Sequence, residues 1–449
     1  MAPLGPEQSG GVATVAVRGP QLPTADRSSA KRELQAAPNL LKFCALAAQL
    51  ALLWALFRLY HTEDVAFEKM TMIVFGAFAV HYWLPFRFKE AFLAAASLGG
   101  AFFILQWQVA AWVIAAGLAI FLVLRAPVAF RLRLLGLFSI FGVLMYGCAT
   151  RRLPLPSGFY AIFGGIFMFR VIVYAYDISH SREPARLTPF LNYFFILPNY
   201  VFTLFPVIDF QTMRRGYYQR EAHEIAQQGI RWMMRGFVQL CLYRLIFYFN
   251  DRYLPDRVTT FRALAATIVL SYLLYLNVSG RFHIIVGMLH LFGYDLPETN
   301  RRYFLARGLI DLWRRINIYW KDFMMKTVYY PFYFKFRKRG DFRARLGATA
   351  AVFVVSCALH PYQTFWLIGD LNIRLTDTIF WLILGVSVVA TVWYTETHKP
   401  RKRPVWQTRT LHATQVAATF CYMATIWSLW SALSFRSWFY LLTHWVAAR

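Results

Sequence analysis

Long apolar runs separated by short polar stretches dominate the chain. The first run extends from Leu40 to Tyr60, and a helix of about 20 apolar residues is long enough to cross a bilayer. Similar runs lie near residues 70–86, 91–124, 132–149, 158–176, 190–208, 229–249, 260–278, 346–369, 374–394 and 410–432. The pattern predicts an all-α polytopic membrane protein with about ten or eleven transmembrane helices.

Some apolar stretches do not have the length of a single crossing. Residues 91–124 are longer, so we expect a turn at Gly99-Gly100 or at Gln106–Gln108. The pieces 284–292 and 438–446 are shorter, and they predict re-entrant or interfacial helices. The chain lacks the alternation of apolar and polar residues that is typical of β-barrel strands.

The N-terminal stretch has a different composition. Residues 1–36 are rich in Pro, Ala, Gly and Ser and carry four basic residues. Such a segment buries too little apolar surface to fold alone. We therefore expect a disordered cytoplasmic tail, followed over residues 37–449 by a single polytopic membrane domain.

Composition and charge agree with this architecture. Hydrophobic residues make up 58% of the chain, against about 45–50% in soluble domains. The net charge is +26, yet the basic residues form short clusters between apolar runs, as in cytoplasmic loops. Two apolar runs separate the clusters at 335–345 and 399–403, which puts both on the cytoplasmic side. The bilayer, and not a nucleic acid, is the expected partner of these charges.

Asn317 is a polar residue in apolar surroundings. A helix over residues 309–324 would place it on one face with Trp313, Trp320 and Met324. A buried amide without a partner costs about 1–3 kcal/mol. The residue therefore either bonds a neighbouring helix or belongs to a functional site.

His360 is an ionisable residue near the middle of the apolar run 346–369. Ionisable groups at this depth are rare, and they often mark functional sites. Pro361 has no N–H and disfavours helical geometry at the residue before it, so we expect a helix break at His360. A neutral histidine bonded to a backbone carbonyl is the structural alternative.

Other candidates carry weaker signals. His283 and His290 share a helical face but lack a third ligand, so no metal is expected. Cys357 is either a nucleophile or, more simply, a packing residue. No cysteine pair of CxxC type occurs, and neither disulfides nor a zinc site is expected. The groups interpreted as solvated or capping are Asp177, His180 and Asp209.

The segment before Asn317 has a distinctive order of residues: Asn277-Val-Ser-Gly280, Gly287, Leu296-Pro297-Glu298, Arg301 and Trp313-Arg314-Arg315. It resembles the signature of the membrane-bound O-acyltransferases (MBOAT), in particular their bacterial branch of alginate O-acetyltransferase type. Ala358-Leu359-His360 takes the place of that family's histidine motif, although Pro361 stands where the branch usually has glycine. The resemblance covers roughly residues 158–395, where it implies an MBOAT-like core.

The resemblance implies an enzyme that moves an acyl group, such as acetyl, from a thioester donor to a hydroxyl. It makes His360 the catalytic histidine, and Asn317 takes the second active-site position, which is His in many bacterial members. A histidine is suited to remove the hydroxyl proton, and an amide N–H is suited to hold the carbonyl oxygen as it gains charge.

The expected donor is acyl-CoA or another acyl thioester, and no permanently bound cofactor is expected. Cationic side chains near the cytoplasmic end are suited to its phosphates, although they are equally suited to anchor the protein at the interface. The candidate donor-binding residues are Trp313, Arg314, Arg315, Trp320, Lys321 and Lys326.

The acceptor stays open between an exopolysaccharide, a lipid and a small secreted product. By analogy with the branch resembled, we expect a bacterial inner membrane protein with a cytoplasmic N-terminus, and a periplasmic partner protein is a further expectation. Two other classes stay open: a polytopic transporter with a broken-helix substrate site at His360, and a non-catalytic membrane scaffold.

Overall fold

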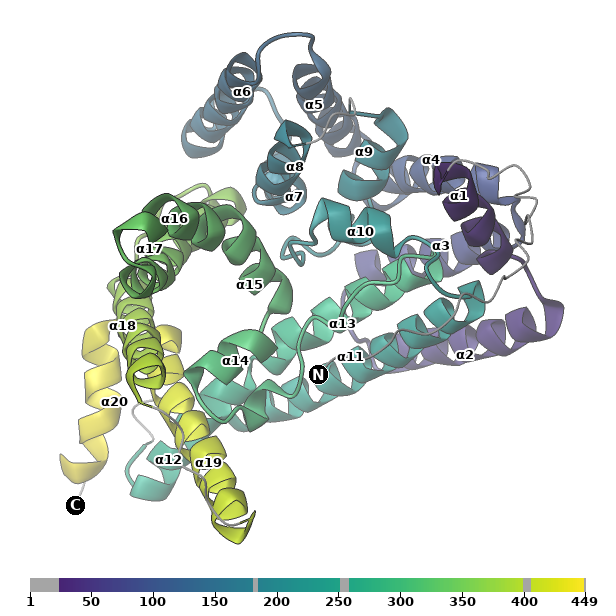
Figure 1. The fold of residues 1–449 in the computed structure, drawn as a ribbon. Coiled ribbons are helices and arrows are strands. Elements are labelled where there is room, and N and C mark those ends of the chain that lie inside the picture. Colours follow the sequence, from purple (N-terminus) through teal and green to yellow (C-terminus); the bar gives the residue numbers. More distant parts are fainter. Residues whose placement is uncertain (1–23, 181–184, 251–257, 399–404, 448–449) are drawn as a thin grey trace, which may run out of the picture.

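The computed structural model describes residues 24–180, 185–250, 258–398 and 405–447. Within these ranges the chain is helical and has no strand, apart from one β-bridge between Tyr217 and Tyr294. The all-α prediction is confirmed for this part of the chain (Figure 1). The helices before residue 220 are α1 (Thr24–Gln35), α2 (Leu40–Leu59), α3 (Val65–Trp83), α4 (Phe86–Ile104), α5 (Trp107–Arg125), α6 (Phe130–Thr150), α7 (Phe159–Phe167), α8 (Arg170–Ser179), α9 (Leu187–Phe194), η1 (Leu197–Tyr200) and α10 (Phe210–Gly216).

The helices after residue 220 include two short ones, α14 and α15, which lie between the α11–α13 pair and the α17–α18 pair in Figure 1. These later helices are α11 (Ala222–Asn250), α12 (Phe261–Leu273), α13 (Leu276–Leu291), η3 (Tyr303–Leu305), α14 (Leu309–Arg315), α15 (Ile318–Met324), the π-helix η4 (Met325–Tyr329), α16 (Tyr330–Phe336), η5 (Arg337–Arg339), α17 (Asp341–Ile368), α18 (Leu375–Thr397), α19 (Val405–Ser431) and α20 (Phe435–Ala447).

Seven described segments are long and apolar enough to cross a membrane: α2, α3, α5, α6, α12 with α13, α17 and α18. The bent pair α7–α8, with 40° between its helices, adds an eighth if it forms one span. These helices indicate a multi-pass integral membrane protein, and the described residues hold fewer candidate spans than the about ten or eleven crossings that hydropathy predicts. The helix α11, for example, is continuous, but Arg231, Arg235 and Arg244 interrupt its apolar sequence.

The stretch 190–208, predicted to be a span, is not a continuous helix. The helix α9 ends at Phe194, η1 follows, and the chain then reaches Asp209 without a further helix. Prolines within the stretch remove the N–H groups that a helix needs. Its large apolar side chains are buried in protein, among them Phe190, Phe194, Phe195, Leu197 and Tyr200. High hydropathy here marks a protein core, so the predicted crossing is wrong.

Two other expectations concern the run 91–124 and the N-terminal tail. The long apolar run 91–124 divides between α4 and α5 at Leu105-Gln106, which confirms the turn expected at Gln106–Gln108. Residues 24–35 form α1, and residues 1–23 lie outside the described part, so the expected disorder of the N-terminal tail stays a prediction.

Helices α11 and α13 approach each other closely because glycines face each other at two levels. A Cβ atom on Gly236 would lie 2.5 Å from the Gly280 carbonyl oxygen, and one on Gly229 would lie 2.5 Å from the Gly287 carbonyl oxygen. No side chain fits at such distances, so the backbones touch as in other membrane helix pairs built on small residues. Two glycines of the MBOAT-like segment therefore have a packing role.

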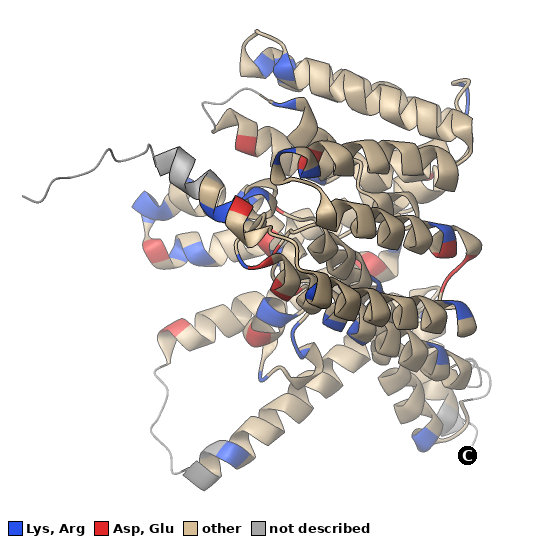
Figure 2. Cartoon of the chain, turned by 90° about the vertical axis from the view of Figure 1, so that its right-hand side faces the viewer, with Lys and Arg blue, Asp and Glu red and all other residues tan. Residues whose placement is uncertain are grey.

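The α17–α18 pair agrees with the expectation that the basic clusters at 335–345 and 399–403 lie on the same side of the membrane. Arg345, near the start of α17, forms a salt bridge with Glu396, near the end of α18, with 3.2 Å between Nη2 and Oε2. The basic segment 335–345 therefore lies at the same end of the pair as residue 396, whereas the cluster 399–403 lies outside the described part. Figure 2 shows that charged residues gather largely near helix ends, and the middles of the long helices are mostly uncharged.

Candidate active site

The helix expected over residues 309–324 is broken at Asn317. The helix α14 ends at Arg315 and α15 begins at Ile318, and Asn317 between them has φ 39° and ψ 61°. Asparagine adopts this left-handed conformation more readily than most residues. Its Oδ1 also caps α15 by accepting a hydrogen bond from Trp320 N–H at 3.3 Å. The single-helix prediction is therefore wrong, and Asn317 lies at a corner between two helices.

The segment 297–301 holds this corner with hydrogen bonds to the backbone. Asn300 Oδ1 accepts from Asn317 N–H at 2.8 Å, and the Thr299 carbonyl accepts from Ile318 N–H at 2.8 Å. Thr299 and Asn300 are both buried. Sequence reasoning missed these two residues, although they directly follow the Leu-Pro-Glu motif.

Glu298 fastens the same segment to α11 and α13. Its carboxylate accepts a hydrogen bond from Arg235 of α11, and His283 Nε2 of α13 lies 3.9 Å from Oε1. Burial raises the pKa of Glu298, but the interactions with His283 and Arg235 outweigh burial and leave this pKa below its ordinary value. The Leu-Pro-Glu motif therefore connects the glycine-packed helices to the corner at Asn317.

His360 lies within a continuous helix. The helix α17 runs from Asp341 to Ile368 with Pro361 inside it, so the break expected at His360 is wrong. Membrane helices tolerate an internal proline when neighbouring groups and hydroxyl side chains satisfy the backbone. Pro361 deprives the Cys357 carbonyl of its helical donor. Thr364 Oγ1 donates to a different carbonyl, that of His360, at 3.2 Å.

Three tryptophans surround the His360 imidazole. Its ring centroid lies 4.7 Å from that of Trp381, 5.5 Å from that of Trp430 and 6.3 Å from that of Trp320. Among the described residues, no side chain or backbone group hydrogen-bonds its ring nitrogens. The residue is partly exposed, so the imidazole is available to a molecule in the cavity that it faces.

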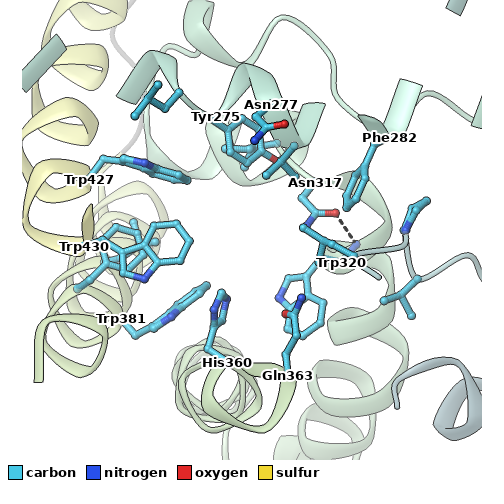
Figure 3. Close-up of a pocket in the computed structure, with 18 of the residues that line it drawn as sticks. Tyr275, Asn277, Phe282, Asn317, Trp320, His360, Gln363, Trp381, Trp427 and Trp430 are labelled. Carbon is cyan, nitrogen blue, oxygen red and sulfur yellow. Dashed lines mark hydrogen bonds between the residues drawn. The ribbon is translucent and has the colours of Figure 1, made fainter. Parts of the chain in front are cut away.

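The structure brings His360 and Asn317 to the same cavity, which has a volume of about 490 Å³ (Figure 3). The indoles of Trp381, Trp427 and Trp430 form one side, and Asn317 lies on the opposite side. Most of the lining is apolar, and its polar residues are Tyr243, Tyr275, Asn277, Asn317, His360, Gln363 and Thr364. Such a site combines an apolar enclosure with a few converging polar groups, as ligand sites usually do.

Two polar residues of this cavity were not singled out by sequence reasoning. Gln363 follows His360 by three positions, and a continuous helix places both on one face. The expected break at Pro361 concealed this relation. Asn277 drew notice only as part of the MBOAT-like segment, yet its Oδ1 is buried and has no hydrogen-bond partner among the described residues.

A second cavity, of about 840 Å³, contains several cationic side chains. Trp313 and Val388 line both cavities, so the two are neighbours separated by these side chains. Four of the candidate donor-binding residues line the second cavity: Trp313, Arg314, Lys321 and Lys326.

The other two donor-binding candidates lie elsewhere. Trp320 lines the His360 cavity. Arg315 lines neither cavity, because its guanidinium turns toward α14, where Nε donates to Asp311 Oδ1 at 2.7 Å.

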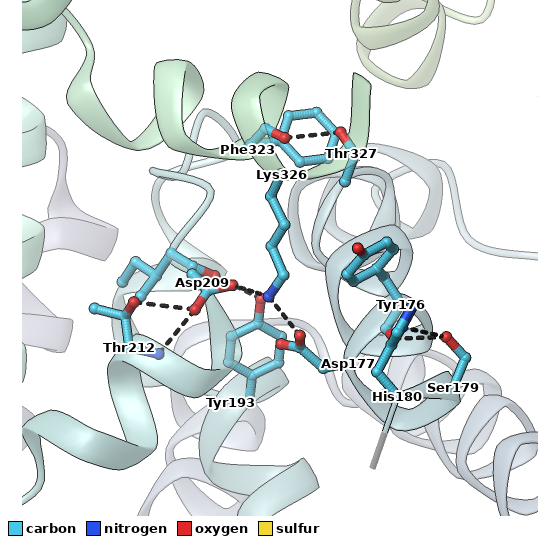
Figure 4. A network of polar contacts seen from close by, with 11 residues as sticks. Tyr176, Asp177, Ser179, His180, Tyr193, Asp209, Thr212, Phe323, Lys326 and Thr327 are labelled. Atoms are coloured by element: carbon cyan, nitrogen blue, oxygen red, sulfur yellow. Dashed lines mark hydrogen bonds and ion pairs between the residues drawn. The ribbon is translucent and has the colours of Figure 1, made fainter. Parts of the chain in front are cut away.

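Lys326 belongs to a cluster with two carboxylates (Figure 4). Its ammonium group hydrogen-bonds both Asp177 of α8 and Asp209, which precedes α10. Burial lowers the pKa of Lys326, but the bonds to both carboxylates outweigh burial and raise it above the ordinary value. Asp209 also caps α10 through Thr212 N–H at 2.8 Å, as expected, whereas Asp177 is buried and not solvated.

The remaining candidates do not join the His360 cavity. Cys357 lines a separate apolar groove between α17 and α18. His283 Nδ1 lies 2.8 Å from the Ser279 carbonyl oxygen, and His290 Nδ1 lies 2.8 Å from the Val286 carbonyl oxygen. Among the described residues, no group of three His, Cys, Asp or Glu side chains is arranged to hold a metal ion.

Comparisons of the chain with protein-family models and with curated proteins find no match.

Proposed function

We propose that the protein is a membrane-bound O-acyltransferase of MBOAT type, with His360 and Asn317 as its catalytic pair. The observation that carries the proposal is that these two residues, distant in the sequence, line one largely apolar cavity. The MBOAT-like segment adds support, because residues 297–301 of that segment hold the backbone of Asn317.

In the proposed reaction, the oxygen of an acceptor hydroxyl attacks the thioester carbonyl carbon, and the C–S bond breaks. His360 accepts the hydroxyl proton and returns it to the departing thiolate. Asn317 Nδ2 donates a hydrogen bond to the carbonyl oxygen as that oxygen gains charge. This donor is available because Oδ1 is engaged by Trp320 N–H, while no described group accepts from Nδ2.

The second cavity suits the phosphate groups of an acyl-CoA donor. Arg314 and Lys321 line it, and guanidinium and ammonium groups bind phosphate with charge-assisted hydrogen bonds. For the thioester arm to reach His360, the side chain of Trp313, which separates the two cavities, has to move aside. We assign Lys326 to a structural role, because two carboxylates already engage it.

We infer a bacterial inner membrane from the branch resembled, and we infer from the basic clusters that the N-terminus and the segment 335–345 lie in the cytoplasm. A cytoplasmic acyl-CoA then enters from the side of that segment. The acceptor is a hydroxyl of an exopolysaccharide, a lipid or a small secreted product, and a periplasmic partner completes the transfer where the acceptor lies outside the membrane. The transporter alternative loses its main argument, since α17 is continuous at His360.

Purified protein in nanodiscs, supplied with radiolabelled acetyl-CoA or longer acyl-CoAs and membrane or glycan extracts, tests the proposal. We expect release of free thiol and labelling of an acceptor, both abolished in His360→Ala. The matched control is His398→Ala, because His398 directly follows the last residue of α18 and lines neither cavity. Transfer that persists in His360→Ala would overturn the mechanism, and no thiol release with any acyl-CoA would favour the scaffold.

A further inference from the structure

Asn300 is a buried amide whose hydrogen bonds reach two walls of the His360 cavity. It is 2% exposed. Its Oδ1 accepts from Asn317 N–H at 2.8 Å and from the Tyr275 hydroxyl at 3.1 Å. Its Nδ2 donates to Thr299 Oγ1 at 3.3 Å, so both ends of the carboxamide are engaged. Asn300 itself does not line the cavity.

The Asn317 N–H and the Tyr275 hydroxyl, which Asn300 binds, both need a hydrogen-bond partner from another segment of the chain. The Asn317 N–H lies at the N-terminal end of α15, where helices leave their first N–H groups without a carbonyl. Asn317 is also left-handed at φ 39°, a conformation that persists only when its surroundings hold it. Tyr275 lines the cavity from α13's side, and its ring lies 5.4 Å from that of Trp427.

We propose that Asn300 is a positioning residue of the transferase: by joining the Asn317 backbone to Tyr275, it aims the Asn317 amide into the cavity. The expected effect on kcat rests on the proposed function, whereas the expected effect on the rigidity of the corner at Asn317 does not. A fully satisfied buried polar network is rigid, and a displacement of about 1 Å at a catalytic group can lower a rate about 100-fold.

Two substitutions of Asn300 distinguish the role of its acceptor oxygen from the role of its side-chain volume. Asn300→Leu keeps the approximate volume and removes the acceptor, whereas Asn300→Asp keeps an oxygen for both donors. For Asn300→Leu we expect kcat about 10–100-fold lower, with donor KM unchanged. For Asn300→Asp we expect kcat within about threefold of the parent, since both hydrogen bonds can form.

Hydrogen exchange measured by mass spectrometry gives a readout that needs no acyl transfer. In Asn300→Leu, the peptide over residues 313–322 should exchange about tenfold faster than in the parent protein, and Asn300→Asp should restore protection. If Asn300→Leu does not fold, Asn300→Ser replaces it, because a serine hydroxyl is too short to reach Asn317. Unchanged exchange in the variant that lacks the acceptor would overturn the positioning role, whether or not transfer is found.

Asn199→Leu is the matched control. Asn199 is also buried, and its Nδ2 donates to the Phe194 carbonyl and to no group of the segment 297–301 or of Asn317. This control should lower the melting temperature but leave exchange over residues 313–322 and kcat close to the parent values. Equal effects of the two leucine variants on kcat would reduce Asn300 to a general stability role and refute the proposal.

Discussion

Asn317 has two separable tasks, and three substitutions distinguish them. It holds a left-handed corner and caps α15 with Oδ1, and in the proposed reaction it donates from Nδ2. Asn317→Gly keeps the backbone conformation but removes the side chain. Asn317→Asp keeps a capping oxygen and removes the amide N–H, whereas Asn317→Ala removes the donor and the cap and disfavours the left-handed backbone.

The structure predicts different changes in the free energy of unfolding for the three variants. In Asn317→Ala, the left-handed backbone costs about 1–2 kcal/mol, and the lost cap costs about 1 kcal/mol. We therefore expect unfolding to become easier by about 2–3 kcal/mol. A glycine at the cap costs only about a few tenths of a kcal/mol, and aspartate caps about as well as asparagine. All three should lose the oxyanion donor, which is worth about 2.7–4 kcal/mol of barrier.

The assay is steady-state transfer with the preferred acyl-CoA, paired with thermal unfolding in the same detergent. We expect kcat to fall about 100- to 1,000-fold in all three variants, whereas only Asn317→Ala should show a clearly lower melting temperature. The reasoning is refuted if Asn317→Gly retains parental turnover. Loss of activity in Asn317→Ala alone would show that the corner matters and the amide donor does not.

Three further predictions concern groups around the site. Arg314→Gln combined with Lys321→Gln should raise the donor KM about tenfold or more with little change in kcat, and equal KM values would remove the phosphate role. Glu298→Gln should lower the melting temperature above about pH 4.5, the ordinary pKa of the group. A carboxyl whose pKa is lower in the folded state stabilises the fold at pH values above its pKa in the unfolded state. The difference in melting temperature between the parent and Glu298→Gln should therefore vanish as the pH falls through the folded-state pKa. Lys326→Met leaves buried Asp177 without its cation and should cost about 3 kcal/mol of stability, measured by chemical denaturation. An unchanged free energy of unfolding would remove the structural role of Lys326.

Hydropathy predicted a helix accurately where that helix is long and uninterrupted. The predicted run 132–149 corresponds to α6, and 374–394 corresponds to α18. It failed at 190–208, where prolines break the helix and protein covers the side chains. A side chain buried in protein and one buried in lipid require the same apolar composition, so hydropathy alone does not separate them.

At the candidate site, the sequence identified Asn317 and His360 but predicted the wrong backbone at both. Periodicity predicted a straight helix through Asn317, and the proline rule predicted a break at His360. Both rules consider only hydrogen bonds within one segment. In the folded chain, Asn300 and Thr299 supply bonds that stabilise a corner at Asn317, and α17 continues through Pro361 within packed surroundings.

The sequence by itself determined the helical class, the multi-pass membrane character and the two unusual polar residues, because these follow from composition and local pattern. Only the tertiary structure decided that Asn317 and His360 line one cavity, and that Arg315 and Lys326 turn to carboxylates. It also decided that Asn300 holds the corner at Asn317. These relations depend on which distant segments pack together, and the burial and hydrogen bonding that select such packing are properties of the whole fold.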